Sequence, residues 1–374
     1  MTQAEAEAEA RALSRLASDE LSALPRGIGD VHAAIADRVF DALGSPAAPV
    51  RFVHQTIARG VYSSLSGGLR VATSVATQRR AGDVPLSETP RGAMVIAALN
   101  GLYGDRLEAE GSSLAIPMQV RNPARPSPHA VVFVHGLGET EHAWGSPSYG
   151  QRLESELGLT PVFVRYNTGR HISQNGAALA ALLEGLEAER ITLVGHSMGG
   201  LVARAACHHG GTWTEKVRLT VSLGTPHTGA PLEQAVHAMS AALHLAPETR
   251  PFARFLRRRS AGIRDLRRGS LVDEDWRDRD PDALRAKALR EVPLLRHATH
   301  AFVAATITKS DKHPLGRLLG DTLVLSPSAS GRRLGLEHGL ALGGTHHLEL
   351  LNHPEVYAQL RAWLGQSSAS TSWP

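Results

Sequence analysis

The hexapeptide Gly195–Gly200 (GHSMGG) has the residue types needed for nucleophilic catalysis by a serine. An apolar run, ITLV, leads directly into it, and an alanine-rich helical pattern follows. A G-x-S-x-G sequence between a strand and a helix is typical of a nucleophile elbow, a sharp turn that exposes the serine hydroxyl at the carboxyl end of the strand. Gly195 and Gly199, two residues before and two residues after the serine, leave room for such a turn. The sequence therefore predicts Ser197 as a nucleophile.

A serine hydroxyl needs a histidine to take its proton and a carboxylate to orient that histidine. In chains with this kind of turn, the partners follow in the order serine, acid, histidine. We expect Asp321, in a GDTLV loop, to be the acid, and His347, in GTHHL before the last helix, to be the base. Asp311 stays open as a second candidate acid, and His346 as a second candidate base.

Acyl transfer to a serine places negative charge on the carbonyl oxygen of the substrate, and backbone N–H groups usually stabilise that charge. The sequence VHGLG closes a predicted strand ahead of the elbow, where a loop with such donors belongs. We expect the N–H groups of Leu137 and Met198 to form the oxyanion hole. For His196 and His227, which lie near the predicted site, we expect supporting or structural roles.

Short β-branched runs alternate with helical patterns after residue 129. Apolar strands are expected at Ala130–Val134, Pro161–Arg165, Ile191–Val194, Val217–Leu223 and Ala301–Thr308. Helices are expected at Ser173–Ala188, Met198–His208 and Pro354–Leu364. Strands that are apolar on both faces are covered by helices on both sides, so the pattern predicts an α/β fold with a mostly parallel sheet.

The chain divides into an N-terminal helical accessory region, residues 1–111, a main domain, residues 112–366, and a tail, residues 367–374. In the accessory region the periodicity predicts a small helical bundle, whose last helix is expected to stop at Gly104. Within the main domain, residues 231–296 lack strand character, and we interpret them as a helical cap.

The cap is expected to leave the sheet at its carboxyl edge, where Ser197 must open. Loops of this length are usually functional. We therefore expect Phe252 and Phe255, in an apolar part of the cap, to bind the acyl group of the substrate. An arginine cluster in the same segment, from Arg257 to Arg268, is interpreted as a solvated helix face, with contact to an anionic lipid as the alternative.

The composition restricts the function classes. The 374 residues are 42% hydrophobic and 20% charged, as in a soluble globular protein. Most of the 40 basic residues are arginine, which we attribute to codon usage, and no nucleic-acid-binding motif is visible. A single cysteine, Cys207, excludes an intrachain disulfide and a cysteine zinc site. The 19 histidines are scattered along the chain, and no metal or cofactor is expected. Apolar runs are shorter than the roughly 20 residues of a membrane span, and no secretion signal is seen, so we expect a cytoplasmic protein.

The motifs HGLG, GHSMGG, GDTLV and HHLELLNHP together resemble an α/β-hydrolase serine lipase or esterase. The segments Tyr166–Ser173 (YNTGRHIS) and Leu223–Gly229 (LGTPHTG) are similar to the glycosylphosphatidylinositol inositol-deacylase-like branch of lipases. The resemblance covers about residues 112–366. It implies an α/β-hydrolase fold and the same nucleophile, acid, base and oxyanion donors that the residues suggest.

These features predict a carboxylic-ester hydrolase that acts through an acyl-enzyme on a small-molecule or lipid ester, with water as co-substrate. Two alternatives stay open: an acyltransferase with the same triad, and a catalytically silent binding protein on the same fold. The acyl length, a peripheral contact with a membrane and the oligomeric state also stay open.

Overall fold

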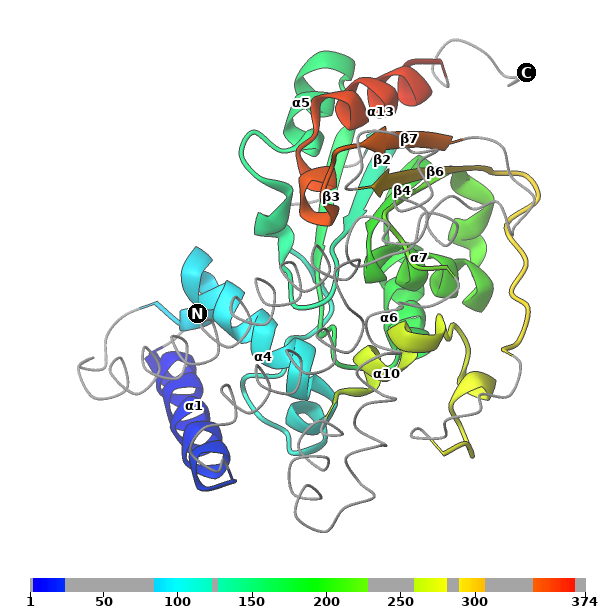
Figure 1. The fold of residues 1–374 in the computed structure, drawn as a ribbon. Helices are drawn as coiled ribbons and strands as arrows, with labels where there is room; N and C mark the ends of the chain where they lie inside the picture. The colour runs from blue at the N-terminus through cyan, green and yellow to red at the C-terminus, as the bar shows by residue number, and fades with distance from the viewer. Residues whose placement is uncertain are drawn as a thin grey trace, which may run out of the picture. The chain divides into compact units, whose positions relative to one another are not determined.

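The computed structural model describes residues 3–23, 84–122, 127–227, 259–280, 289–306 and 339–366 (Figure 1). Their contacts divide the chain into two units. The first comprises the described parts of 1–100 and 106–116, and the second comprises 101–105 and the described parts of 117–374.

The first unit contains the helix α1 (Gln3–Ala23), the 3₁₀ turn η2 (Leu86–Glu88) and most of the helix α4 (Pro90–Ala109). Thr89 caps α4 by accepting a hydrogen bond from Gly92 N–H at 3.1 Å, and the helix begins at Pro90. The expected stop at Gly104 is wrong, because α4 continues to Ala109.

Packing explains why a glycine lies in the interior of α4. A Cβ atom at Gly104 would lie 1.8 Å from Asn167 Oδ1 in the second unit, to which Gly104 also belongs. Asn167 is fixed there because its Nδ2 donates to Gly104 O at 2.8 Å and its Oδ1 accepts from Gly169 N–H at 3.0 Å. Gly104 therefore permits a close contact and does not end the helix.

The second unit is built on one sheet with the strand order β1-β3-β2-β4-β5-β6-β7 among the described residues. All neighbouring strands are parallel except β1, which pairs antiparallel with β3. The strands are β1 (Gln119–Val120), β2 (Ser127–Val134), β3 (Thr160–Arg165), β4 (Ala188–His196), β5 (Val217–Leu223), β6 (Thr299–Thr306) and β7 (Gly339–Gly343). The predicted α/β-hydrolase fold class is thus confirmed.

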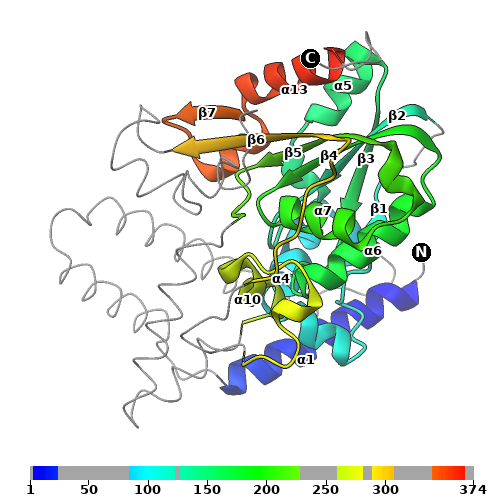
Figure 2. The same cartoon turned by 90° about the vertical axis from the view of Figure 1, so that its right-hand side faces the viewer.

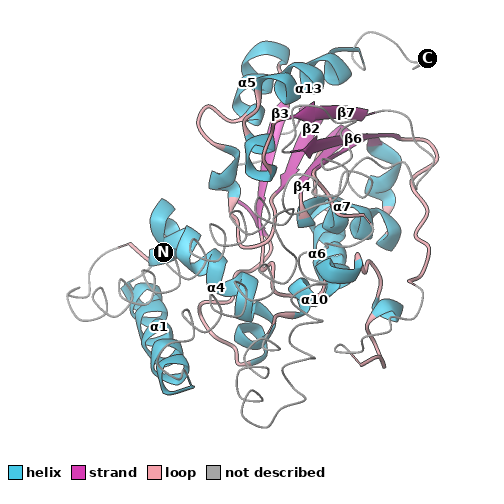
Figure 3. Cartoon of the chain, viewed as in Figure 1, coloured by secondary structure: helices cyan, strands magenta, loops and turns pink. Residues whose placement is uncertain are grey.

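Helices cover both faces of the sheet (Figures 2 and 3). One face carries α6 (Ile172–Glu184) and α7 (Met198–His209), and the other carries α5 (Tyr149–Leu157) and α13 (Pro354–Gln366). Val132 belongs to the hydrophobic core under α6 and α7, whereas its neighbours Val131 and Phe133 belong to the core under α5 and α13. This alternation accounts for the near-continuous apolar strands in the sequence.

The described elements agree with the expected ones to within a few residues, and β5 coincides with its predicted range. Three elements of the second unit were not predicted: β1, which has two residues, the helix α5, and β7, whose sequence GLALG is short and bounded by glycine. Of the expected cap, residues 231–258 and 281–288 lie outside the described residues, as do residues 24–83 of the predicted helical bundle. No described helix combines the length and the hydropathy that crossing a bilayer requires.

We expect Gly104→Ala to lower the free energy of unfolding by about 1–3 kcal/mol, because the added methyl group displaces the bonded Asn167 amide. Urea denaturation followed by circular dichroism measures the change. The matched control is Gly365→Ala in α13, where an added Cβ would meet nothing within 4 Å. That variant should be unchanged or up to about 1 kcal/mol more stable, since alanine favours helices. Equal effects at the two positions would contradict the packing role of Gly104.

Candidate active site

Ser197 occupies a turn between β4 and α7 with φ 52° and ψ −122°. A non-glycine residue at positive φ is strained by about 1–3 kcal/mol and persists only where its surroundings hold it. Here Ser197 N–H donates to Leu223 O at 2.8 Å, which ties the turn to β5. A Cβ at Gly199 would lie 2.1 Å from Val134 O, so only glycine fits at the second position after the serine. The strand, turn and helix that a nucleophile elbow requires are therefore present.

The loop after β2 passes beside this serine. A Cβ at Gly136 would lie 3.1 Å from Ser197 Cβ. Gly136 N–H donates to Glu139 Oε2 at 2.7 Å, and Gly138 N–H donates to Thr168 Oγ1 at 3.0 Å. The N–H of Leu137 lies between these two and, in the part of the chain that the structure describes, donates to no protein acceptor. The loop thus leaves one amide available for a ligand next to Ser197.

Met198 N–H is the second expected donor. It is the first amide of α7, where helical N–H groups have no intrahelical partner. Over the described ranges it, too, donates to no protein acceptor. Two amides with this property therefore flank Ser197, one from the loop after β2 and one from the turn itself.

His347 and His346 occupy different environments. His347 begins the 3₁₀ turn η7 (His347–Leu351) and is 3% exposed. A Cβ at Gly224, the residue after β5, would lie 3.0 Å from His347 Nδ1. His346 is exposed, and its N–H donates to Glu349 Oε2 at 2.7 Å. The structure thus places His347, and not His346, against the end of β5 that holds the Ser197 backbone.

His196 is fully buried beside the site and engages both ring nitrogens. Its Nδ1 lies 3.1 Å from Glu139 Oε2, and its Nε2 lies 3.3 Å from the backbone oxygen of His347. The rings of His196 and His347 have centroids 4.8 Å apart. Since both nitrogens of His196 already face acceptors, this histidine is not available to take a proton from Ser197.

Glu139 is a site residue that the sequence analysis missed. Its side chain is 15% exposed. Burial acts to raise the pKa of Glu139, but the charge and hydrogen bond of His196 and the N–H of Gly136 outweigh it, and the pKa falls to about 2. A glutamate three residues after a loop glycine could be predicted to accept a hydrogen bond from the N–H of that glycine. Its contact with His196 has no signal in the sequence, because the two residues are 57 positions apart.

The segment Tyr166–Ser173 forms hydrogen bonds to the loop after β2. Tyr166 Oη donates to His135 O at 2.7 Å, and Thr168 accepts from Gly138 as described above. At its other end, His171 Nδ1 lies 2.9 Å from Asp265 Oδ2 in α10 (Ala261–Arg268). This segment therefore connects the loop beside Ser197 to the described part of the predicted cap.

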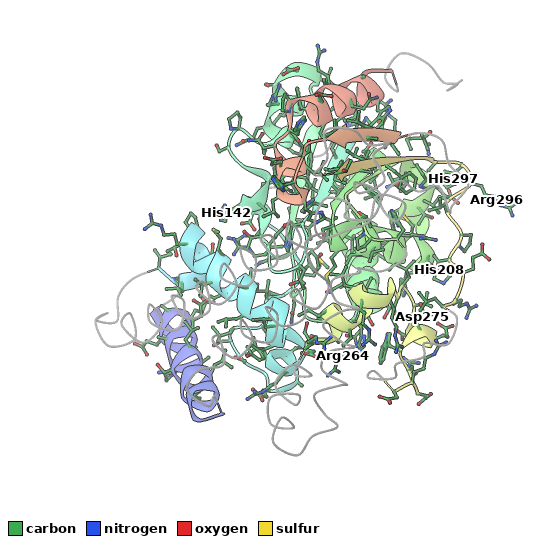
Figure 4. All side chains as sticks on the ribbon, viewed as in Figure 1. His142, His208, Arg264, Asp275, Arg296 and His297 are labelled. Carbon is green, nitrogen blue, oxygen red and sulfur yellow. The ribbon has the colours of Figure 1, made fainter. Side chains whose placement is uncertain are left out.

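The described part of the cap is helical, with α10 followed by the 3₁₀ turn η5 (Asp273–Asp275). Arg264 in α10 and Asp275 in η5 mark its position in Figure 4. The candidate acids Asp321 and Asp311 and the candidate acyl-binding residues Phe252 and Phe255 all lie outside the described residues.

His227 follows β5 and is 8% exposed. Burial, with a smaller effect from the charge of Arg204, lowers the pKa of His227 to about 3. The side chain is therefore neutral at physiological pH. Its ring meets Phe302 edge-on at a centroid distance of 5.1 Å, which is a packing contact. In the described ranges, no group of three or more His, Cys, Asp or Glu side chains is placed to hold a metal ion.

Comparison with known proteins gives one family match and a set of distant structures. Residues 182–277 match the model of the PGAP1-like alpha/beta domain family. A search of curated proteins finds no match. The lipase BlEst2 of Bacillus licheniformis, in its mature form, aligns at 20% identity with a TM-score of 0.43, covering 67% of this chain and 98% of that one. A lipase-esterase related protein from Clostridium acetobutylicum aligns at 13% identity and 0.40, covering 66% and 99%. A putative aryl esterase from Burkholderia cenocepacia aligns at 15% and 0.39, covering 68% and 96%.

The strand order and the serine turn give the second unit the α/β-hydrolase fold. The part of it that runs from the end of α6 through the elbow to η5 is similar to the PGAP1-like alpha/beta domain.

We expect Gly224→Ala to slow the labelling of Ser197 by a fluorophosphonate about 10-fold or more, because the added Cβ would lie 2.9 Å from Leu350 Cδ1 and 3.0 Å from the His347 ring and would displace that ring. Mass spectrometry of the labelled protein measures the rate. Gly344→Ala is the matched control, since Gly224 and Gly344 have φ of 58° and 70°, but a Cβ at Gly344 would meet nothing within 4 Å. Both variants carry the strain of alanine at positive φ, roughly 1–2 kcal/mol. Similar labelling rates in the two variants would show that His347 does not act on Ser197.

Proposed function

We propose that the protein is a serine carboxylic-ester hydrolase. The observation that carries this proposal is the placement of Ser197 on a strained strand-to-helix turn, between two backbone N–H groups that have no acceptor within the described chain. Such donors stabilise the negative charge that forms on a carbonyl oxygen during acyl transfer. An ordinary βα turn needs neither the strained serine nor two such amides beside it.

In the proposed reaction, Ser197 Oγ attacks the carbonyl carbon of the ester while His347 accepts its proton. The carbonyl oxygen becomes an oxyanion and is bound by the N–H groups of Leu137 and Met198. His347 then gives the proton to the departing alcohol oxygen, which leaves an acyl group on Ser197. Water, deprotonated by His347, attacks this acyl-enzyme and releases the carboxylic acid and the free serine.

Asp321 is proposed as the acid that orients His347 and stabilises its protonated form. The choice of His347 as the base is supported by its burial against the end of β5 and by the engagement of both nitrogens of His196.

The substrate is proposed to be a small-molecule or lipid ester whose acyl group is bound by the cap, residues 231–296. Phe252 and Phe255 remain the residues proposed to line the acyl pocket. Support comes from the described part of the cap, because α10 is anchored through Asp265 to the same segment that holds the loop beside Ser197. The cap is thus attached near the site that it is proposed to cover.

Ser197→Ala should remove hydrolysis of p-nitrophenyl butyrate, with kcat falling by about 10⁴-fold or more, because loss of a nucleophile cannot be replaced by the remaining groups. Labelling by a fluorophosphonate should disappear in the same variant. The thermal midpoint should stay within a few degrees of the native value, since a partly exposed hydroxyl is exchanged for hydrogen. A variant that kept most of its turnover would show that another residue is the nucleophile.

His347→Ala and Asp321→Asn should each lower kcat by about 10³-fold or more, because triad members fail as a unit. The neighbouring variants His346→Ala and Asp311→Asn are the controls and should keep activity within about threefold of the native protein. Steady-state kinetics on p-nitrophenyl butyrate distinguish the pairs. A dead His346→Ala or Asp311→Asn variant beside an active partner would move the base or the acid to that residue.

A further inference from the structure

We infer that Glu139 and His196 form a buried carboxylate–imidazolium pair that positions the oxyanion loop, Gly136–Glu139, and the loop of the catalytic histidine. Neither residue contacts the reacting atoms in this inference; both are positioning residues. The inference rests on the proposed function, because positioning has a measurable effect only if Ser197 catalyses a reaction.

The peptide that carries Leu137 N–H is held from its carbonyl side. Its oxygen, Gly136 O, accepts from His135 Nδ1 at 2.9 Å and from Glu139 N–H at 3.3 Å. In a trans peptide the N–H points away from the carbonyl, so these two bonds set the direction of the Leu137 N–H. Rotation of this peptide would turn the proposed donor away from the oxyanion.

The neighbouring peptides are held as well. Glu139 Oε2 accepts from Gly136 N–H at 2.7 Å on one side, and Thr168 Oγ1 accepts from Gly138 N–H at 3.0 Å on the other. Glu139 therefore contributes twice, through its backbone N–H and through its carboxylate. Glycine restricts its backbone dihedral angles less than other residues do, and Gly138 in this loop has φ 69°. Hydrogen bonds are therefore needed to fix the loop backbone.

The protonation of His196 follows from the two acceptors that face its ring nitrogens among the described residues. A carboxylate oxygen and a peptide oxygen can only accept hydrogen bonds, and both ring nitrogens of His196 lie within 3.3 Å of one. Only the doubly protonated ring can donate to both. Because His196 is fully buried, its charge requires an opposite charge beside it, and Glu139 supplies that charge. The lowered pKa of Glu139 agrees with this assignment.

The proton on His196 also matters for the charge near the nucleophile. Glu139 Oε2 and Ser197 Cβ lie 3.0 and 3.1 Å from one common point, the position of a Cβ on Gly136. A carboxylate without a partner at this distance would oppose the negative charge of the oxyanion. The imidazolium cancels that charge, and through His347 O it also connects the pair to the loop of the base.

The test is a set of variants assayed on p-nitrophenyl butyrate: Glu139→Gln, His196→Gln and the double variant. We expect Glu139→Gln to lower kcat about 10- to 100-fold with KM within about twofold, because oxyanion donors act mainly in the transition state. His196→Gln should lower kcat further, since it leaves a carboxylate without its cation. The double variant should recover to about the level of Glu139→Gln, which a double-mutant cycle reports as coupling.

The matched control is Glu141→Gln, two residues further along the chain at the first position of the 3₁₀ turn η3 (Glu141–Trp144). Glu141 is 13% exposed and pairs with Arg165 and Arg121, but no contact joins it to Gly136 or His196 among the described residues. Its replacement should lower the thermal midpoint and leave kcat within about twofold of native once the folded fraction is equal. This variant separates loop stability from positioning.

A Glu139→Gln variant with native kcat overturns the inference, and so does a loss of kcat that Glu141→Gln matches. In either case an inactive Ser197→Ala variant would leave the proposed function standing.

If Glu139→Gln does not fold, proton NMR of the Ser197→Ala protein tests the protonation of His196 directly. Two low-field ring N–H signals that vanish on adding His196→Gln are expected at neutral pH. Finding His196 with a single ring proton would overturn the inference.

Discussion

The strained turn at Ser197 constrains the parts of the domain around it. A residue with a side chain is held at φ 52°, and the backbone of the following residues approaches the end of β2 so closely that Gly199 admits no Cβ. Such a turn persists because a hydrogen bond to Leu223 ties it to β5 and because β2, β4 and β5 are parallel and end at the same edge. The strand order and the glycines are both requirements of this one turn.

The two carboxylates near Ser197 are paired with groups of opposite charge. The loop after β2 brings two acidic side chains, Glu139 and Glu141, into poorly solvated positions. Each is partnered, the first by His196 and the second by Arg165 and Arg121, because an isolated buried carboxylate would be costly or would take up a proton. The ionised carboxylates around Ser197 therefore have cationic partners. The N–H groups of Leu137 and Met198 are not among the donors to these carboxylates and remain for a ligand.

The segment Tyr166–Ser173 couples parts of the second unit that are distant in sequence. It supports the loop beside Ser197 through Tyr166 and Thr168, and it accepts α10 through His171 and the N–H of Ile172, which both bond to Asp265. A single short connection between β3 and α6 thus holds both the oxyanion loop and the described part of the cap. Asn167, Thr168, His171 and Ser173 are explained by these contacts, since each of them makes a hydrogen bond to a residue outside the segment.

The sequence by itself determined the features that depend on local patterns: the apolar strands β2 to β6, the helices α7 and α13, and the strand-turn-helix setting of Ser197. Periodicity and turn residues act over a few positions and are readable in order along the chain. Only the tertiary structure decided that Gly104 continues a helix, that His347 is buried while His346 is exposed, and that Glu139 lies against His196. Each of these depends on which side chains meet after folding, between residues tens to more than a hundred positions apart, and such contacts leave no periodic trace in a single sequence.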